Sequence, residues 1–358
     1  MKLVCLGDIC TSSPLNISGQ SVPAIQPVDY VLANLEGMIV RPTVAADRSA
    51  SASLYNTLDV LNALQAFQVR AAWLANNHIG DLPMAIRETI EILKQANIAG
   101  FGAGVDLAAA SRPLVLHQDG TIVKAFAFGW DVIGCRPATK GGEGVNPFTP
   151  QHVLRTIRNL RVVDTSSFVL FIMHWNYELE SYPQPAHRQL AHDLIRGGVD
   201  AVIGLHPHVA QGAEMIEGKP VIYSLGNWFF PVRQVGHLLL KYPPVSAREL
   251  AVEFEIEGRQ VNGIRFHWHQ FDAEQCLIHF EKTEGWDGPI LQKLTPFAGM
   301  SHPEYVRWFR ANRTRRLGLP VYGDYHHIWR NRVKDRYVKL RQKFIEMLVR
   351  WHFKNGLS

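Results

Sequence analysis

Short apolar runs alternate along the chain with segments whose apolar residues recur every three or four positions. The runs at residues 168–173, 200–205 and 220–225 are rich in β-branched and aromatic side chains, which is typical of strands buried on both faces. Between the first two runs, residues 184–196 have helical spacing and end at Gly197-Gly198, where we expect the helix to stop. This order predicts a βαβ crossover.

The first half of the chain shows the same alternation. Residues 2–6, 28–33 and 69–75 are apolar runs that predict strands, and residues 83–96 have the pattern of an amphipathic helix. Residues 114–117 and 122–130 flank Asp119-Gly120, a dipeptide typical of a tight hairpin turn. Strands that alternate with helices in this way predict an α/β protein.

A second hairpin is predicted later in the chain. Residues 249–256 and 261–270 alternate apolar and polar positions around Glu257-Gly258, which indicates a half-buried antiparallel pair. His267 and His269 fall on the face opposite Phe266 and Trp268. We therefore expect these two histidines to face solvent.

From about Pro303 the chain becomes helical, aromatic and basic. Residues 301–358 contain 14 Lys or Arg and 4 Asp or Glu, a net charge of +10, whereas the whole chain carries +5. One face of the last helix is apolar and the other is cationic; the apolar positions are Val333, Tyr337, Leu340, Phe344, Met347 and Leu348. We expect the apolar face to pack on the rest of the protein, with the basic face in solvent. Contact with a membrane surface or an anionic polymer is the alternative.

The overall composition suits a soluble protein with one large core. Of 358 residues, 47% are hydrophobic and 19% are charged. The N-terminal residues 1–10 have the pattern of a first strand rather than a signal peptide, and no apolar run approaches the roughly 20 residues that span a bilayer. The four cysteines are scattered without CxxC spacing, so we expect reduced thiols. These features predict a cytoplasmic location.

Polar side chains follow most of the predicted strands. They are carboxylates, amides and imidazoles: Asp8, Glu36, Asn77, His78, His174, His206 and His208. Each one taken singly has a structural explanation, such as a turn at Asp8. Taken together they suit Mn, Fe, Zn or Co, because thiolate sites need cysteines at the right spacing. The sequence therefore predicts one or two divalent metal ions, which could clamp a phosphoryl group.

The motifs around these residues resemble a known family. GD, NLEG, NNHxxD, HWxxE, GxHPHV and YSLGN occur in this order within residues 1–232. The order resembles the CapA family of bacterial poly-γ-glutamate and capsule synthesis proteins, within the calcineurin-like metallophosphoesterase superfamily. The resemblance implies a four-layer α/β/β/α sandwich over residues 1–272 with a metal centre at the strand ends. Residues 273–358 would form a linker and a basic helical extension.

The resemblance also implies roles for individual residues. It places Asp8 and His208 on one metal and Asn77, His174 and His206 on the other, with Glu36 as the bridging carboxylate. His78 would be a histidine that does not bind metal but protonates the leaving group or stabilises the transition state, oriented by Asp81. Glu178 and Asn227 would support the ligands or face the substrate.

The sequence departs from the superfamily on the first strand. Where such phosphoesterases usually show Asp-x-His, this chain has Asp8-Ile9-Cys10. One ligand of the first metal is missing unless Cys10 supplies it, and a lone cysteine after a buried strand is more often inert packing. The Gly-His-x-His pattern is also changed, because Pro207 stands between His206 and His208 and fixes the backbone there. A weaker or single-metal site and a substrate other than a simple phosphoester both stay open.

Two functions follow from the resemblance. The first is a metal-dependent hydrolase that acts on a phosphoester or an anionic polymer in the synthesis of capsule, poly-γ-glutamate or another extracellular polymer. The alternative is a non-catalytic accessory protein of polymer synthesis with a degenerate metal site. The expected partner is the polymer-synthesis machinery, and contact of the basic C-terminal helix with the inner face of the membrane is the alternative to its packing on the protein. Nucleic acid is not an expected partner, because the basic tail lacks recognisable DNA- or RNA-binding modules.

Overall fold

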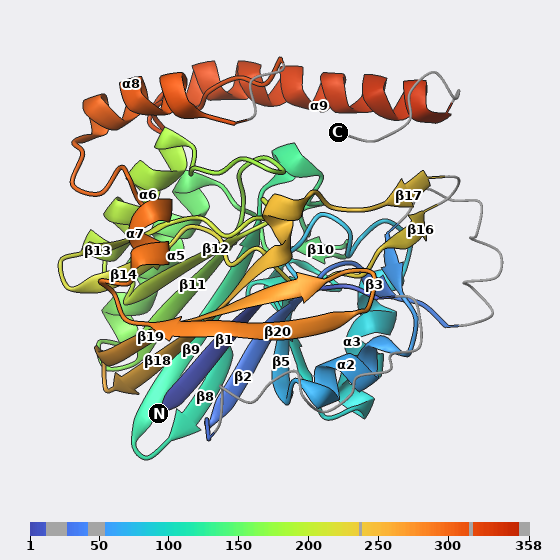
Figure 1. Ribbon diagram of the computed structural model, residues 1–358, viewed down its shortest axis with the longest axis horizontal. Helices are drawn as coiled ribbons and strands as arrows, with labels where there is room; N and C mark the ends of the chain where they lie inside the picture. The colour runs from blue at the N-terminus through green and yellow to red at the C-terminus, as the bar shows by residue number, and fades with distance from the viewer. Residues whose placement is uncertain (12–26, 42–53, 236–237, 315–317, 351–358) are drawn as a thin grey trace.

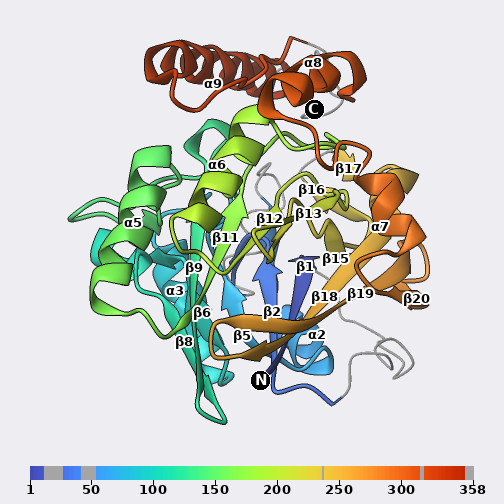
Figure 2. The same ribbon diagram turned by 90° about the vertical axis from the view of Figure 1, so that its left-hand side faces the viewer.

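Two β-sheets lie face to face in the centre of the computed structural model, which describes residues 1–11, 27–41, 54–235, 238–314 and 318–350. Helices α5 (Pro150–Val163) and α6 (Pro185–Arg196) pack on the outer side of one sheet, and α2 (Val60–Ala66) and α3 (Ala85–Gln95) pack on the other (Figures 1 and 2). This arrangement is the four-layer α/β/β/α sandwich that the family resemblance implies.

The larger sheet has eight strands in the order β20-β19-β18-β1-β2-β5-β6, with β15 paired to β1 beyond the end of that path. Strands β1, β2, β5 and β6 are parallel, and β18 to β20 form an antiparallel meander. Their bounds are β1 Lys2–Ile9, β2 Tyr30–Leu35, β5 Val69–Trp73, β6 Ala99–Phe101, β15 Asn227–Phe229, β18 Arg248–Glu257, β19 Gln260–Asp272 and β20 Leu277–Glu284.

The smaller sheet has six strands in the order β13-β14-β12-β11-β9-β8. They are β8 Leu114–Gln118, β9 Thr121–Gly129, β11 Phe168–His174, β12 Ala201–Leu205, β13 Ala213–Ile216 and β14 Lys219–Ile222. The predicted β11-α6-β12 crossover is confirmed, since β11 and β12 are parallel neighbours. The predicted hairpin at Asp119-Gly120 is also confirmed, with φ of +48° and +78° at the two turn residues.

The described part of the chain contains further ribbons and helices. Three two-stranded ribbons are β3 Met38–Ile39 with β4 Tyr55–Asn56, β7 Ala103–Gly104 with β10 Gly144–Val145, and β16 Arg233–Val235 with β17 Leu238–Leu240. The remaining helices are α4 Leu107–Ala110, η2 Asp131–Ile133, η3 Pro244–Ala247, α7 Pro289–Leu294, α8 His302–Asn312 and α9 Ile328–Arg350. Within the described ranges, no helix is both long enough and apolar enough to cross a membrane.

Alternation along β11 separates the two cores of the sandwich. Phe168, Leu170 and Ile172 belong to the core that includes the space between the sheets, whereas Val169 and Phe171 pack with α5 and α6. Because successive side chains of a strand point to opposite faces, a fully apolar run such as β11 fits only a strand covered on both sides.

The prediction that His267 and His269 face solvent is wrong. Both are buried on β19. His267 lies 2.8 Å from the Thr283 hydroxyl of β20 and 3.1 Å from Glu253 of β18, and His269 packs edge-on against Trp228. The face that alternation marks as polar is thus buried at His269 by the Trp228 side chain of β15, a strand of the same sheet.

The predicted packing of the last helix is also wrong. Val333, Tyr337, Leu340 and Phe344 are exposed on α9, while Val338 and Ile345 are its buried apolar side chains in the described part of the helix. The body of the protein thus contacts a different face of α9 from the one with the longest apolar stripe. The predicted boundary at residue 272 stays a prediction; β20, which follows it, is hydrogen-bonded to β19. Residues 315–317 and 351–358 of the predicted extension lie outside the described residues.

Candidate metal centre

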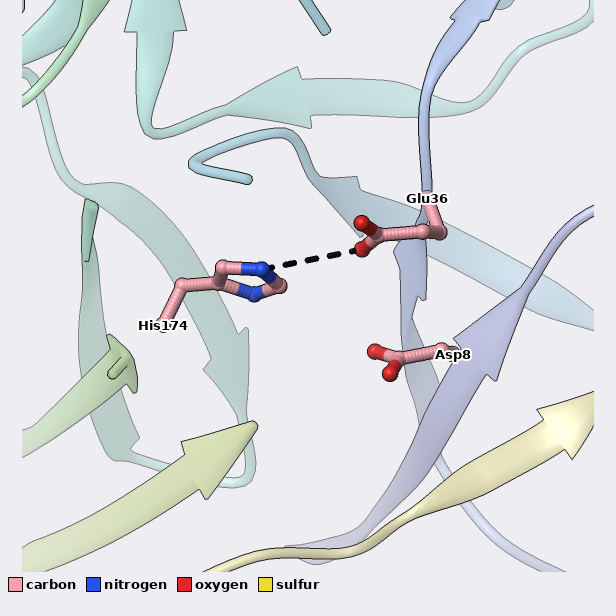
Figure 3. Close-up of side chains that lie close together, drawn as sticks. All are labelled: Asp8, Glu36 and His174. Carbon is pink, nitrogen blue, oxygen red and sulfur yellow. Dashed lines mark ion pairs between the residues drawn. The ribbon is translucent and has the colours of Figure 1, made fainter. Parts of the chain in front are cut away.

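Three buried side chains from both sheets converge at the carboxyl ends of their strands. Asp8 lies on β1, Glu36 directly follows β2, and His174 ends β11. One ligand atom from each lies within 4.8 Å of the others, so the group could hold a metal ion. Figure 3 shows the two carboxylates and the imidazole pointing into the same space. The site therefore bridges the gap between the two sheets.

The close approach of β1 to the segment before β15 depends on Gly7. A Cβ atom at this position would lie 2.2 Å from the Gly226 carbonyl oxygen and 2.8 Å from that of Asn227. Without a side chain, the backbone amide of Asp8 can donate to the Gly226 carbonyl at 3.1 Å, and Asp8 pairs in register with Asn227. Gly7 thus lets the Ser-Leu-Gly-Asn segment lie beside the carboxylate.

Asn34 holds the two carboxylates together, although it is not among the site residues predicted from the sequence. Its side-chain amide donates to Asp8 Oδ1 at 2.7 Å and to Glu36 Oε2 at 2.6 Å. Asn76 in turn donates to Asn34 Oδ1 at 3.3 Å. The signal was present in Asn34-Leu35-Glu36, because residues two apart on a strand point to the same face. Asn34 could therefore have been expected beside Glu36.

The backbone of the His206-Pro207-His208 turn is unusual. His206 has a φ of +92° and His208 a φ of +56°, a region that residues other than glycine rarely adopt. The His174 and His206 rings lie 5.0 Å apart, and the His206 and His208 rings 5.8 Å apart. Each such residue costs about 1–3 kcal/mol of strain, and strain of this kind is concentrated at functional sites. The turn brings both imidazoles to the strand end where His174 lies.

His208 interacts with Asp8 and with Asn227. Its Nδ1 atom lies 3.1 Å from Asp8 Oδ2 and 2.9 Å from Asn227 Oδ1. Burial lowers the pKa of His208, but the hydrogen bond and the charge of Asp8 outweigh this effect and raise the pKa to about 9. The turn after β12 is therefore tied to the end of β1.

Asn77 and His174 form a second contact within the site. Asn77 Oδ1 lies 2.8 Å from His174 Nε2, and Glu36 Oε2 lies 3.9 Å from the same nitrogen. An amide oxygen, a carboxylate and an imidazole thus meet at one point, a donor set that suits borderline divalent metals.

His78 and Asp81 lie at the rim of the site. His78 Nδ1 is 3.1 Å from Asp81 Oδ2, and both side chains are partly exposed. Burial lowers the pKa of His78, but the neighbouring Asp81, together with Glu36 and Glu178, more than offsets this and raises it. Glu178 is half-buried and acts on His78 through its charge. The arrangement favours a protonated imidazole facing the site.

Cys10 is bonded away from the cluster. Its Sγ atom accepts a hydrogen bond from Arg233 Nη1 at 2.8 Å, and it is buried beside Leu54 and Phe230. Burial raises the pKa of the Cys10 thiol to about 12, although the Arg233 charge acts in the opposite direction. Arg233 had no part in the sequence argument, and nothing in its local sequence indicates this contact.

Burial shifts the pKa values of the candidate ligands Glu36, His174 and His206. Burial, and then the charge of Asp8, raises the pKa of Glu36 to about 8. Burial and neighbouring imidazoles lower the pKa of His174 and His206 well below the usual value. A divalent cation needs ionised carboxylates and neutral imidazoles. Its charge would favour ionised Glu36, and the two histidines are already neutral.

Several buried atoms of the site also lack hydrogen-bond partners among the described residues. They are Glu36 Oε1, His174 Nδ1, His206 Nδ1 and Asp8 Oδ2, the last of which has His208 as an ion-pair partner. Buried polar atoms are almost always paired, so unpaired ones in one cluster call for an explanation. The residues present therefore fit a metal ion, because their donor types suit one and because a metal ion would pair with these buried polar atoms.

Comparison with known proteins gives a family. The model of the bacterial capsule synthesis protein family PGA_cap matches residues 8–232, which include every predicted site residue. A capsule biosynthesis protein CapA of Bacillus anthracis is 25% identical over 213 residues, covering 58% of this chain and 52% of that protein. A PGA biosynthesis protein CapA of Bacillus subtilis is 26% identical and covers 58% and 55%. A probable polyglutamine synthesis accessory protein of Mycobacterium tuberculosis is 29% identical and covers 56% and 55%.

Matches to solved structures are more distant. A hypothetical protein of Thermus thermophilus has a TM-score of 0.46 at 17% identity and covers 75% of this chain and 99% of that one. A 5'-nucleotidase precursor of the same organism has a TM-score of 0.39 at 15% identity and covers 80% and 53%. The chain spans about half the length of the curated relatives that it matches. By the family match over most of its length, the chain belongs to the bacterial capsule synthesis protein family PGA_cap.

Proposed function

We propose that this protein is a metal-dependent hydrolase that acts in the synthesis of capsule, poly-γ-glutamate or another extracellular polymer. The observation that carries the proposal is the convergence of Asp8, Glu36 and His174 within 4.8 Å, beside a paired His78 and Asp81. The names of the relatives in Bacillus support the biological role. The substrate would be a phosphoester or an anionic polymer.

The ligands would come from six side chains, which would hold one or two ions of the Mn, Fe, Zn or Co class: Asp8, Glu36, Asn77, His174, His206 and His208. A bound metal would lower the pKa of a water molecule and neutralise charge that develops on the substrate. Asn34 would keep both carboxylates in place, since its amide donates to each of them. Asn227 would orient His208, since its side-chain oxygen lies 2.9 Å from His208 Nδ1 and can accept a hydrogen bond from it.

Proton transfer would fall to His78. Asp81 lies 3.1 Å from His78 Nδ1, which leaves Nε2 as the ring nitrogen that can deliver a proton to a leaving group. Burial lowers the pKa of His78, but the charges of Asp81, Glu36 and Glu178 raise it overall, which favours the protonated ring that this role requires. The partial exposure of the ring gives a substrate access to it.

Metal content and turnover test the proposal separately. The protein is purified without added metal, analysed for its elements, and assayed with Mn²⁺ against phosphomonoesters, phosphodiesters and γ-glutamyl peptides. We expect bound metal in the unaltered protein, loss of metal in His174→Ala, and loss of turnover with retained metal in His78→Ala. His279→Ala, an exposed histidine on β20, is the matched control. Absence of both metal and turnover would refute the hydrolase.

A non-catalytic accessory function is the second candidate. It is favoured by Cys10, which stands where the superfamily has a histidine and is bonded to Arg233. The relative in Mycobacterium tuberculosis is also named an accessory protein. In this case His78→Ala would leave polymer production in cells intact, whereas loss of polymer on that change would favour the hydrolase.

A further inference from the structure

Helix α9 carries its longest apolar stripe on the outside of the molecule. Trp329 is 77% exposed, Leu340 68% and Phe344 56%, values far above those usual for such large apolar side chains. The stripe runs along the helix and consists of Trp329, Val333, Tyr337, Leu340, Phe344 and Met347. In Figures 1 and 2 α9 lies at the top of the molecule, apart from both sheets. Contiguous exposed apolar surface of this kind marks an interaction site.

The opposite face of α9 is the one that contacts the protein. Val338 and Ile345 are buried there, and Asp335 accepts a hydrogen bond from the Tyr322 hydroxyl at 2.8 Å. At 3.6 residues per turn, Val338 and Leu340 lie on opposite sides of the helix, about 200° apart. The helix is thus attached by one face and presents the apolar stripe directly outward.

Cations border the stripe on both sides. At the same helical spacing, Arg332, Arg336 and Lys343 lie along one edge, and Arg330 and Arg341 lie along the other. The first three and Arg330 are exposed. The sequence of α9 has eight Lys or Arg and two Asp or Glu. An apolar stripe between two rows of cations is typical of a helix that lies in the interface of a membrane rather than across it.

We propose that α9 docks the protein on an anionic phospholipid surface, with the apolar stripe inserted below the headgroups and the bordering cations on the phosphates. Charge complementarity favours this partner. A second copy docked through the same stripe would bring the cationic borders together, which costs free energy. A soluble anionic polymer would pair with the cations but leave the apolar stripe in water.

Docking through α9 also orients the rest of the protein. Lys339 Nζ of α9 lies 2.5 Å from Asp131 Oδ2 of η2. Trp130, which precedes Asp131, donates its backbone N–H to the His174 carbonyl at 3.0 Å. Helix α9 therefore lies at the carboxyl-end side of β9 and β11, where the candidate metal centre is. If the proposed function holds, the membrane surface would lie at the same end of the protein as the candidate metal centre. The docking itself does not depend on that function.

Vesicle flotation with the full-length chain tests the proposal. Vesicles of phosphatidylcholine with phosphatidylglycerol should carry the protein upward, whereas vesicles of phosphatidylcholine alone should bind it at least about tenfold more weakly. Leu340→Asn with Phe344→Asn should lower binding by about tenfold or more for each side chain, since each loses its burial in lipid. Val162→Asn with Val163→Asn, two exposed apolar residues of α5, is the matched control and should bind as the unaltered chain does.

Two further measurements decide between the possible occupants of the stripe. Arg336→Gln with Lys343→Gln should weaken binding to the anionic vesicles by about tenfold or more. The fluorescence emission of Trp329, taken as the difference between the unaltered protein and Trp329→Phe, should shift to the blue on binding. Binding that survives Leu340→Asn with Phe344→Asn would reduce the contact to simple charge attraction and overturn the proposal. Failure of the unaltered protein to bind the vesicles would also overturn it. If light scattering then showed a dimer that Leu340→Asn with Phe344→Asn converts to a monomer, the stripe would be an interface between two copies of the chain. Circular dichroism checks that each variant is folded.

Discussion

His208 Nδ1 lies 3.1 Å from Asp8 Oδ2, and both side chains are buried. This ion pair joins the end of β1 to the turn after β12, so it links the two sheets through residues that the sequence places 200 positions apart. Each charge is buried at the expense of its hydration, and the other charge compensates for that loss. The same two side chains therefore belong to the candidate metal centre and contribute to the stability of the fold.

We expect Asp8→Asn to destabilise the protein by about 3 kcal/mol when metal is removed with a chelator, because His208 loses its buried partner. Adding His208→Asn to Asp8→Asn should recover part of this loss. Urea unfolding of the two single variants and the double variant measures the coupling between the residues. Additive losses, with no coupling, would contradict the pairing.

Replacement of Cys10 should leave the metal content unchanged. Its sulfur accepts from Arg233 and its pKa is raised to about 12 by burial, so it is held as a thiol rather than a thiolate ligand. We expect Cys10→Ala to lower the free energy of unfolding by about 1–2 kcal/mol, from lost packing and from the loss of an acceptor for Arg233. Elemental analysis decides the issue, because loss of one metal per chain would identify Cys10 as a ligand.

Glu249 should destabilise the protein increasingly as the pH rises. Both of its carboxyl oxygens are buried without hydrogen-bond partners among the described residues, and burial raises the pKa of Glu249 well above the usual 4.5. Above pH 4.5 the unfolded chain loses a proton that the folded state keeps, so the free energy of unfolding falls.

We therefore expect Glu249→Gln to be more stable than the unaltered protein, by about 1.4 kcal/mol for each pH unit above that value until the folded carboxyl also ionises. Urea unfolding over a pH series gives the difference. Glu257→Gln, an exposed residue on the same strand, is the control. An equal stability of Glu249→Gln and the unaltered protein at all pH values would contradict this account.

His187 should weaken the protein in acid. It is buried, its ring stacks on Trp175 at 5.1 Å, and burial lowers the pKa of His187 from 6.5 to about 3. Between these values the unfolded chain binds a proton that the folded state does not, so stability is complete above pH 6.5 and falls with decreasing pH.

Near pH 5 this loss should amount to about 2 kcal/mol. His187→Phe keeps an aromatic ring in the stack and should remove that part of the acid sensitivity. Comparing the variant with the unaltered protein near pH 5 and near pH 7 isolates the contribution of this histidine from that of the others. A pH dependence that is the same in both proteins would count against it.

The sequence by itself determined the local elements and the chemistry available to the site. Spacing of two or of three to four residues decides whether a segment can bury one face as a strand or as a helix, so β11, α6 and β12 were predictable. The motifs also sufficed to indicate the family and to name the side chains that follow the strands. Asn34 could have been added by the same alternation, since it precedes Glu36 by two residues.

Only the tertiary structure decided which faces meet. Helical spacing shows that α9 has an apolar stripe, but Val338 and Ile345 take the contact with the body, so the stripe is left outside. His267 and His269 are on a face that alternation marks as polar, yet β15 brings Trp228 against it. Cys10 likewise accepts a hydrogen bond from Arg233, which lies 223 positions later in the sequence. Local spacing is set by the geometry of each element, whereas burial and pairing depend on which distant segments compete for the same surface.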